Sequence, residues 1–429
     1  MQYYIYKYGL DKKTMRYTLK APERLKATVT LPASKSISNR ALIISALSGN
    51  IVTPQNLSDC DDTNVTVRAL RDMPYEIDIM ASGTAMRFMT AYLSVTEGEH
   101  VLTGTERMKH RPIKVLVDAL RYLGADIEYM GEEGFPPLRI RGRKLDGGPL
   151  EIPGNISSQY ISALLMIGPV LENGLELTLT GDIISRSYID LTLHTMHDFG
   201  ATVEWKDIKT IKAEPCGYRQ REYLIENDWS AASYWYEMMA IHNNPGDEIM
   251  LTGLADASRQ GDSVVKYLFS MLGVKTIFES KEPGVPTTVT LKKLPKRLPR
   301  LDYDFINQPD LAQTFVVSCC AMNIPFHFVG LSTLKIKETD RIKALKAEMR
   351  KLGYVIEDRN DSELLWDGER CEPSQEPIDT YEDHRMALSF APFSFVREDL
   401  CINNPQVVTK SYPKFWEDLK MVGFQIIEE

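Results

Sequence analysis

Basic and hydroxyl side chains gather in three short stretches of the first half of the chain. Residues 34–40 read Ser-Lys-Ser-Ile-Ser-Asn-Arg, residues 81–87 read Ala-Ser-Gly-Thr-Ala-Met-Arg, and residues 154–159 read Gly-Asn-Ile-Ser-Ser-Gln. Each stretch precedes an apolar run that suits a buried helix, so each places hydroxyls and free backbone amides at the positive end of a helix dipole. Basic side chains within the first two stretches add formal charge that can bind a phosphate or a carboxylate. The chemistry these stretches favour is therefore the binding of anions.

Ordinary helix capping is the competing interpretation, because Ser, Thr and Asp cap helices in every class of protein. The stretch 34–40 is less ordinary, since it holds two basic residues. It is not a Walker phosphate loop, because the glycines and the Gly-Lys-Ser/Thr order are missing. If several such helix ends face one cleft, an acidic protein acquires a focused positive pocket.

Charged residues that could transfer protons gather in the second half of the chain. Asp310 follows Gln-Pro, residues 337–341 read Lys-Glu-Thr-Asp-Arg, residues 381–385 read Tyr-Glu-Asp-His-Arg, and Lys410 comes later. An arginine a few residues from a carboxylate usually forms a solvent-exposed pair on a helix, which is the competing interpretation of 337–341. Proton transfer would instead need carboxylates or lysines with shifted pKa values in such a charged pocket.

The composition excludes several functional classes. The 429 residues suggest two or three domains, and 43% hydrophobic with 25% charged residues is typical of a globular protein. A net charge of −9 disfavours nucleic-acid binding. No apolar run approaches the roughly 20 residues of a membrane helix, and the N-terminus does not resemble a signal peptide. The six cysteines lack CxxC or metal-ligand spacing. We expect a cytoplasmic protein with no nucleic-acid, membrane or metal partner.

A repeat along the chain positions these stretches. Five amphipathic segments end in a glycine between two apolar residues, at intervals of roughly 70–80 residues. These glycines, which suit the left-handed residue that ends a helix, are Gly124, Gly200, Gly273, Gly353 and Gly423. A weaker sixth segment spans 63–73. A more apolar helix precedes each, beginning near Ser36, Ser82, Ser157, Asp228, Asp310 and Asp383.

Six copies of a buried helix followed by an amphipathic helix are therefore predicted. Strand candidates such as 174–180 and 287–291 lie between the helices. Three copies precede about residue 226 and three follow it, which fits two similar domains. The segment before the first copy is expected to return to the later domain, and Met1 to about Lys20 is either a strand or a lead-in.

Taken in order, these stretches resemble the EPSP synthase family, the 3-phosphoshikimate 1-carboxyvinyltransferases, over nearly the whole chain. The motifs that carry the resemblance are Lys35-Ser-x-Ser-Asn-Arg40, Gly83-Thr-Ala-Met-Arg87, Arg111-Pro112, Ser157-Ser-Gln159, Lys337-Glu-x-Asp-Arg341 and Asp383-His-Arg385. The resemblance implies an α/β (α+β) fold of two similar domains, each of three βαβαββ repeats, that is, an inside-out α/β barrel. The domains would be 33–226 and 1–32 plus 227–429, with crossings near Pro32-Ala33 and Glu226-Asn227 and the active site in the cleft between them.

The implied reaction moves the enolpyruvyl group of phosphoenolpyruvate to the 5-hydroxyl of shikimate 3-phosphate. The products are 5-enolpyruvylshikimate 3-phosphate and phosphate, on the shikimate pathway to chorismate and the aromatic amino acids. The resemblance implies no cofactor and no metal, two small-molecule substrates as the only partners, and a monomer.

By motif, the resemblance assigns three sets of residues. Those expected to hold shikimate 3-phosphate are Lys35, Ser36, Arg40, Ser157, Ser158, Gln159, Ser185, Tyr188, Asp310 and Lys337. Those expected to hold phosphoenolpyruvate are Lys35, Gly83, Thr84, Arg111, Gln159, Arg341, Arg385 and Lys410. The catalytic set is Lys35, Asp310, Glu338 and His384. Glu338 would protonate C3 of phosphoenolpyruvate and later reclaim a proton, whereas Asp310 and Lys35 would share the hydroxyl proton.

Three positions depart from the family's common pattern. Ala81 replaces a frequent asparagine, Phe88 a frequent proline, and Thr333 another frequent asparagine. These changes remove no proposed acid, base or cation, and they leave the affinities for the substrates and for glyphosate open.

Two alternatives remain open. A UDP-N-acetylglucosamine enolpyruvyl transferase shares the implied fold but uses a cysteine acid, and the cysteines here fall elsewhere. A non-catalytic anion-binding protein on the same fold would be expected to have lost Lys35, Asp310 or Glu338, and all three are present.

Overall fold

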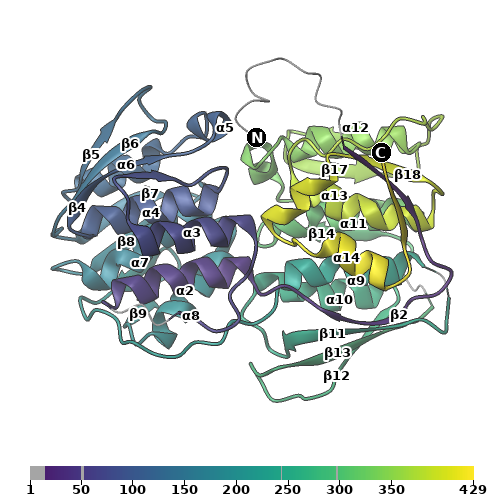
Figure 1. Cartoon of the computed structure of the whole chain (residues 1–429), viewed down its shortest axis with the longest axis horizontal. Helices are drawn as coiled ribbons and strands as arrows, with labels where there is room; N and C mark the ends of the chain where they lie inside the picture. The colour runs from purple at the N-terminus through teal and green to yellow at the C-terminus, as the bar shows by residue number, and fades with distance from the viewer. Residues whose placement is uncertain (1–14, 50–52, 243, 296–297) are drawn as a thin grey trace.

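The computed structural model describes residues 15–49, 53–242, 244–295 and 298–429, which form two bodies side by side (Figure 1). The helices of the first body are α2 (Lys35–Leu47), α3 (Asp61–Asp72), α4 (Gly83–Val95), α5 (Glu106–Lys109), α6 (Lys114–Tyr122), α7 (Ser158–Ile167), the 3-10 turn η1 (Gly168–Val170) and α8 (Arg186–Asp198). Its strands are β3 (Glu76–Asp78), β4 (Gly98–Thr103), β5 (Asp126–Tyr129), β6 (Leu138–Gly142), β7 (Gly148–Pro153), β8 (Leu175–Thr180), β9 (Val203–Trp205) and β10 (Thr210–Ala213).

The second body contains both ends of the described chain. Its α-helices are α9 (Trp229–Ile241), α10 (Val265–Met271), α11 (Ala312–Ala321), α12 (Arg341–Lys351), α13 (His384–Phe390) and α14 (Phe415–Met421). Its 3-10 turns are η2 (Gly261–Val264), η3 (Pro309–Leu311), η4 (Ser332–Ile336), η5 (Ala391–Phe395) and η6 (Pro405–Lys410). Its strands are β1 (Arg16–Lys20), β2 (Lys26–Thr30), β11 (Glu248–Ala255), β12 (Val274–Phe278), β13 (Pro286–Lys293), β14 (Leu301–Asp304), β15 (Phe326–Val329), β16 (Glu357–Arg359), β17 (Glu363–Trp366), β18 (Leu400–Asn403) and β19 (Gln425–Glu428).

The predicted alternation of buried and amphipathic helices is confirmed in six pairs, from α2/α3 to α13/α14. All five predicted glycines adopt a positive φ, from 82° at Gly200 to 103° at Gly423. This conformation ends a helix at little cost only when no Cβ is present. Met73 takes a left-handed conformation at the end of α3, the copy without a glycine.

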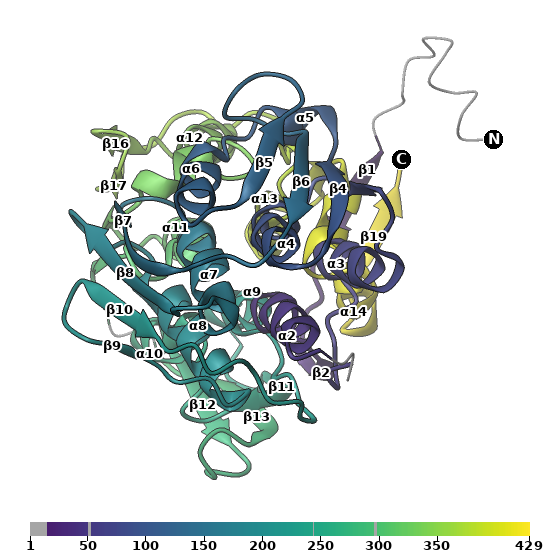
Figure 2. The same cartoon turned by 90° about the vertical axis from the view of Figure 1, so that its left-hand side faces the viewer.

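Four sheets share one pattern of two parallel strands followed by an antiparallel pair. They are β3-β4-β6-β5, β7-β8-β10-β9, β2-β11-β13-β12 and β14-β15-β17-β16. In three of these sheets one α-helix (α4, α7 or α11) links the two parallel strands, which gives a βαβαββ unit. In the fourth, the whole first body and α9 lie between β2 and β11 along the chain. Figure 2 looks onto the first body, where α7 lies inside and strands β8 and β10 lie outside it.

The N-terminal strands belong to sheets of the second body. Strand β2 pairs in parallel with β11, and β1 lies between β18 and β19. Of the segment from Met1 to Lys20, residues 16–20 therefore form a strand, and residues 1–14 lie outside the described part. The first copy differs from the others: between the described residues of α2 and α3 it contributes an isolated bridge, between Gln55 and Leu224.

Two hydrophobic clusters form the cores of the two bodies. The first cluster runs from Ala33 to Ile225, and the second combines Leu19 to Leu31 with Trp229 to Phe424. We call the two bodies with these cores the first half and the second half. No helix within the described ranges has the length and apolar character needed to cross a bilayer.

The chain passes between the halves twice, and the two passages pair with each other. Ser34 donates its backbone N–H to Glu226 at 2.9 Å, and Asp228 donates to Pro32 at 2.9 Å. Asn227, within this paired segment, donates its backbone N–H to Gly253 at 2.9 Å. Gly253 has a φ of 85°, and a Cβ there would collide with the Asn227 side-chain amide. The paired passages are therefore packed tightly against β11.

We expect Gly253→Ala to lower the free energy of unfolding by about 2–4 kcal/mol, because it combines left-handed strain with overpacking. Gly217→Ala is the matched control, because Gly217 has a φ of 65° but a Cβ added there would have no atom within 4 Å. Strain alone should cost the control about 1 kcal/mol. Urea denaturation of both variants measures the difference, and equal losses would show that contact with Asn227 does not matter.

Candidate active site

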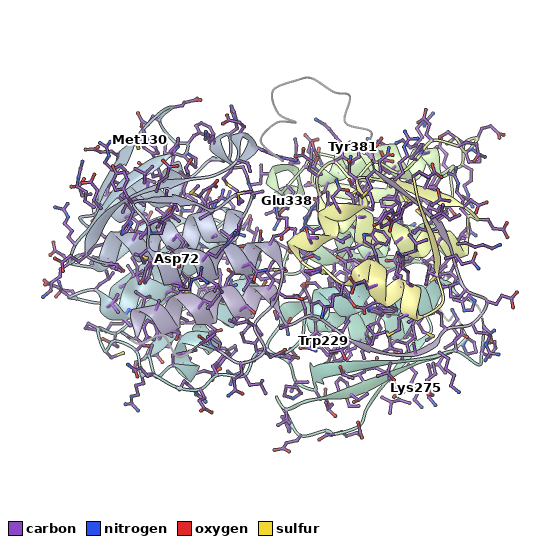
Figure 3. All side chains as sticks on the ribbon, viewed as in Figure 1. Asp72, Met130, Trp229, Lys275, Glu338 and Tyr381 are labelled. Carbon is purple, nitrogen blue, oxygen red and sulfur yellow. The ribbon has the colours of Figure 1, made fainter. Side chains whose placement is uncertain are left out.

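A cavity of about 330 Å³ lies between the two halves, lined by residues of both. Every predicted site residue except Lys410 lines this cavity. Lys410 lies beside it, with Nζ 3.0 Å from Oε1 of Glu338. Figure 3 shows Glu338 at the boundary between the halves. The predicted residues thus come together from five segments of the first half (35–40, 83–84, 111, 157–159 and 185–188) and four of the second (310, 337–341, 384–385 and 410).

The helix ends at the cavity combine capping with charge. The hydroxyls of Ser34, Ser82 and Ser157 accept hydrogen bonds from the backbone amides of the first turns of α2, α4 and α7. The capping interpretation is therefore confirmed for these three serines. Ser36 and Ser158 line the cavity beside them, so the same helix ends still offer hydroxyls to a ligand.

Arg40 is a buried cation with only neutral partners among the described residues. Its guanidinium donates to Thr192 Oγ1 at 2.7 Å, to Ser162 Oγ at 3.1 Å, and to the carbonyls of Ser36 and Tyr188 at 2.8 and 3.2 Å. Burial lowers the pKa of Arg40 to about 10, so it remains charged at neutral pH. An uncompensated buried charge of this kind suits the binding of an anion.

Lys35 pairs with a carboxylate that the sequence did not reveal. Its Nζ lies 3.3 Å from Oδ2 of Asp62, which begins the buried face of α3 and is itself buried. Although burial alone would lower it, the pKa of Lys35 is raised because Asp62 and other neighbouring groups favour the charged form. Lys35 is therefore protonated and positively charged in this state. A protonated lysine cannot accept the proton of the 5-hydroxyl, which disfavours that part of the predicted role.

Arg341 connects three carboxylates at the floor of the cavity. Its Nε lies 2.6 Å from Asp383, its Nη1 3.0 Å from Asp310, and its Nη2 2.9 Å from Glu338. The side chain is 1% exposed. The interpretation of 337–341 as a solvent-exposed helix pair is therefore wrong for Arg341, because α12 begins with this residue pointing inward.

The two carboxylates predicted to transfer protons are held in the ionised form. Burial would raise the pKa of Asp310, but Arg385, Lys337 and Arg341 outweigh it and hold that pKa well below its usual range. Burial likewise opposes Lys410 and Arg341 at Glu338, and these cations hold the pKa of Glu338 well below its usual range. Both groups are therefore ionised in this state and have no proton to donate.

His384 has a different environment from the other predicted catalytic residues. Burial lowers the pKa of His384 well below its usual range, and Lys35 and Arg385 add to the effect. Within the described part of the chain, neither ring nitrogen has a hydrogen-bond partner, and the same holds for Oγ1 of Thr333 in the cavity lining. His384 is a neutral imidazole with free hydrogen-bonding capacity beside the cavity.

The arrangement as a whole suits small, multiply charged anions. Cations from both halves surround the space, and Arg111 forms no ion pair with any described residue. Two ionised carboxylates face the same space and can move protons. Among the described residues, no group of three His, Cys, Asp or Glu side chains could hold a metal ion. Phosphate or carboxylate binding coupled to proton transfer is the chemistry that this cavity can support.

Comparisons with known proteins agree with this chemistry. A family model described as EPSP synthase (3-phosphoshikimate 1-carboxyvinyltransferase) matches residues 19–80 and 72–419. A curated 3-phosphoshikimate 1-carboxyvinyltransferase of Bacteroides fragilis is 58% identical over 413 residues, covering 96% of this chain and 99% of the relative. Another, of Photobacterium profundum, is 35% identical and covers 94% and 97%.

Solved structures with the same fold include two of EPSP synthase from Acinetobacter baumannii. One has a TM-score of 0.77 at 21% identity and covers 97% of this chain and 100% of that structure. The other has a TM-score of 0.74 at 20% identity and covers 96% and 99%. At these identities the solved structures bear on the fold alone.

Proposed function

The chain belongs to the EPSP synthase family, and we propose that the cavity between its halves is where it catalyses the reaction of that family. The protein transfers the enolpyruvyl group of phosphoenolpyruvate to the 5-hydroxyl of shikimate 3-phosphate and releases phosphate, as a transferase of the shikimate pathway. The observation that carries the site proposal is the convergence of cations from both halves on the ionised carboxylates of Asp310 and Glu338.

Shikimate 3-phosphate binds against the first half in this proposal. Arg40 faces its carboxylate, because its buried charge has only neutral partners among the described residues. The cavity-lining hydroxyls of Ser158 and Ser185 surround its phosphate, and Tyr188 lines the same region of the cavity. Asp310 then meets the 5-hydroxyl from the second half.

Phosphoenolpyruvate binds beside it, between Arg111 and the cations of the second half. A Cβ at Gly83 would lie 2.7 Å from Nη1 of Arg111, so glycine leaves room for this guanidinium. Thr84 Oγ1 accepts a hydrogen bond from Gln159 at 3.1 Å, which fixes the amide beside the same space. Arg341, Arg385 and Lys410 complete the set of cations.

Binding of the substrates changes the protonation of Glu338. Its carboxylate is ionised because Lys410 and Arg341 lie against it. When the anions of phosphoenolpyruvate engage these cations, the pKa of Glu338 rises, since like charge disfavours ionisation. Glu338 can then protonate C3 and take the proton back as phosphate leaves. Asp310 accepts the proton of the attacking hydroxyl, and the cations stabilise the tetrahedral intermediate.

Release of inorganic phosphate tests the function. The protein is mixed with phosphoenolpyruvate and shikimate 3-phosphate together and with each substrate alone, and phosphate is followed with time. We expect phosphate only when both substrates are present. Phosphate release with UDP-N-acetylglucosamine as acceptor would indicate the sister transferase, and binding of both substrates without release would indicate a non-catalytic protein.

Lys35→Met is expected to lower kcat/KM about 100-fold to 1000-fold, because Lys35 supplies a preorganised positive charge to both substrates. Steady-state phosphate release gives the value, and the unfolding transition shows whether the variant is folded. Lys109→Met is the control, since Lys109 pairs with Glu106 on the surface of α5. Near-normal kcat/KM in folded Lys35→Met would remove Lys35 from the site.

Glyphosate is expected to compete with phosphoenolpyruvate, because its carboxylate and phosphonate can occupy the same cations. Initial rates measured over a matrix of glyphosate and phosphoenolpyruvate concentrations should show a raised KM for phosphoenolpyruvate and an unchanged kcat. Inhibition that rising phosphoenolpyruvate does not relieve would reject this binding mode.

We also propose that residues 33–226 and residues 1–32 plus 227–429 act as two domains that close on the substrates. The separate hydrophobic clusters and the paired passages between them support this division. Both halves of the chain line the cavity, and we propose that the protein acts as a cytoplasmic monomer without nucleic-acid or membrane partners.

A further inference from the structure

Asp262 is a buried carboxylate that has no role in the mechanism proposed above. It lies in the turn η2 and is 4% exposed. Its two oxygens are each 3.3 Å from the phenol oxygen of Tyr188, and the Ser230 hydroxyl donates to Oδ2. Tyr188 and Ser230 line the cavity, whereas Asp262 lies behind them. Asp262 therefore acts on the reaction through neighbouring side chains and not by direct contact with a ligand in the cavity.

Tyr188 places Asp262 in line with Asp310. The phenol oxygen of Tyr188 also lies 3.4 Å from Oδ2 of Asp310. A phenol has one proton to donate and can accept another hydrogen bond, so it can donate to one carboxylate while the other carboxylic acid donates to it. Burial raises the pKa of Tyr188 well above its usual range, and Asp262 and Asp310 add to the effect, so the phenol keeps its proton.

We propose that Asp262 is the end of a proton relay that starts at the attacking 5-hydroxyl and passes through Asp310 and Tyr188. As the hydroxyl oxygen bonds to C2 of phosphoenolpyruvate, its O–H bond breaks and the proton passes to Asp310. Asp310 then gives that proton to the oxygen of Tyr188 while Tyr188 gives its own proton to Asp262. The relay rests on the proposed function.

The relay runs in reverse when phosphate leaves. Asp262 returns a proton to Tyr188, Tyr188 returns one to Asp310, and Asp310 releases it to the departing phosphate. Glu338 meanwhile takes back the proton that it gave to C3. All groups of the protein thus end the cycle in their starting protonation states.

The charges around Asp262 favour this direction. Arg385 faces it from α13, Asp310 from η3, and Asp228 from the start of α9, together with the hydroxyls of Tyr188 and Ser230. Burial, with smaller contributions from Asp310 and Asp228, raises the pKa of Asp262 to about 6 against the opposing effect of Arg385. Asp310, whose pKa lies well below its usual range, holds a proton less well. Transfer of a proton from Asp310 to Asp262 is therefore favourable in free energy.

The pH dependence of kcat tests the relay. The relay needs ionised Asp262, so wild-type kcat at saturating substrates should fall as the pH is lowered through about 6. We call this fall of kcat at low pH the acidic limb. Asp262→Asn should lower kcat at pH 7.5 about 10-fold to 100-fold, and its pH profile should lack the acidic limb. Ser230→Ala removes a hydrogen bond that favours ionised Asp262, so the limb should move to higher pH by about one unit.

Two further variants separate the relay from a structural effect. Ser187→Ala removes a hydrogen bond to the carbonyl of Asn307 at the same boundary and should keep the wild-type limb. In the double variant of Tyr188→Phe with Asp262→Asn, kcat should be no lower than in the slower single variant, because either change breaks the same chain.

An acidic limb retained in Asp262→Asn would overturn the relay, and so would losses that multiply in the double variant. If the acidic limb of Ser230→Ala lies at the same pH as that of the wild type, the relay is also overturned. This test holds whether or not Asp262→Asn folds. All of these outcomes presuppose wild-type turnover. Absence of phosphate release by the wild-type protein would reject the proposed function itself.

Discussion

Glu338→Gln lowers kcat by about 1000-fold in the proposed mechanism, with both substrates still bound. Glutamine keeps the size of the side chain and an oxygen for Arg341, which lies 2.9 Å from the native carboxylate. It cannot carry the proton that C3 must receive and return. The loss should therefore appear in kcat far more than in the affinity for shikimate 3-phosphate.

Two measurements check this expectation. Phosphate release gives kcat, and exchange of solvent deuterium into C3 of phosphoenolpyruvate reports proton transfer by Glu338 directly. Both should fall together. Glu357→Gln is the control, because Glu357 pairs with Arg359 on the surface of the same half. A folded Glu338→Gln protein that retains near-normal kcat or C3 exchange would show that another group is the acid.

Arg341→Met is expected to reduce both stability and activity severely. Its guanidinium lies within 3.0 Å of Asp310, Glu338 and Asp383, and it is almost fully buried. Removing it leaves buried carboxylates without their shared cation, which costs about 3–5 kcal/mol of unfolding free energy. Activity should fall at least about 1000-fold, because Glu338 and Asp310 lose their positions as well as their partner.

The difference in stability between the wild type and Arg341→Met should change with pH in a definite direction. In the wild type, the depressed pKa values of Asp310 and Glu338 contribute stability that is present above their unfolded pKa values and is lost as the pH falls through the folded ones. In Arg341→Met the pKa values of these carboxylates in the folded state rise. Lowering the pH therefore protonates them and removes the unpaired buried charge that destabilises the variant. The gap in unfolding free energy should be largest near pH 7 and should shrink toward pH 4.

Urea denaturation at both pH values measures that gap. Lys343→Met is the control on the same helix, since the Lys343 side chain is 76% exposed and pairs with Asp340. An exposed pair of this kind contributes less than about 1 kcal/mol. A gap that stays constant or grows as the pH falls would mean that the three carboxylates do not depend on Arg341.

The helix boundaries could be predicted because their signals are local. Ser34 and Ser82 cap the helices that follow them, and Gly353 takes the left-handed conformation that ends α12. Strand partners carry no comparable local signal. That β1 lies between β18 and β19 depends on pairing across almost the whole chain, and no pattern within residues 16–20 specifies it.

The charged site could be predicted only in part for a similar reason. Motifs named the residues, but the partners of each charge come from distant segments. Asp62 lies on a different helix from Lys35, and their pairing turns a presumed proton carrier into a fixed cation. Asp262 is linked to Asp310 by hydrogen bonds through Tyr188 of the other half. Sequence spacing does not reveal which carboxylates become buried neighbours.

A crystal structure with shikimate 3-phosphate and glyphosate tests the account most directly. It predicts the 5-hydroxyl within hydrogen-bond distance of Asp310, about 3 Å. It also predicts the carboxylate and phosphonate of glyphosate between Arg111 of the first half and the cations of the second. Ligands that contact only one half, or a 5-hydroxyl that points away from Asp310, would contradict it.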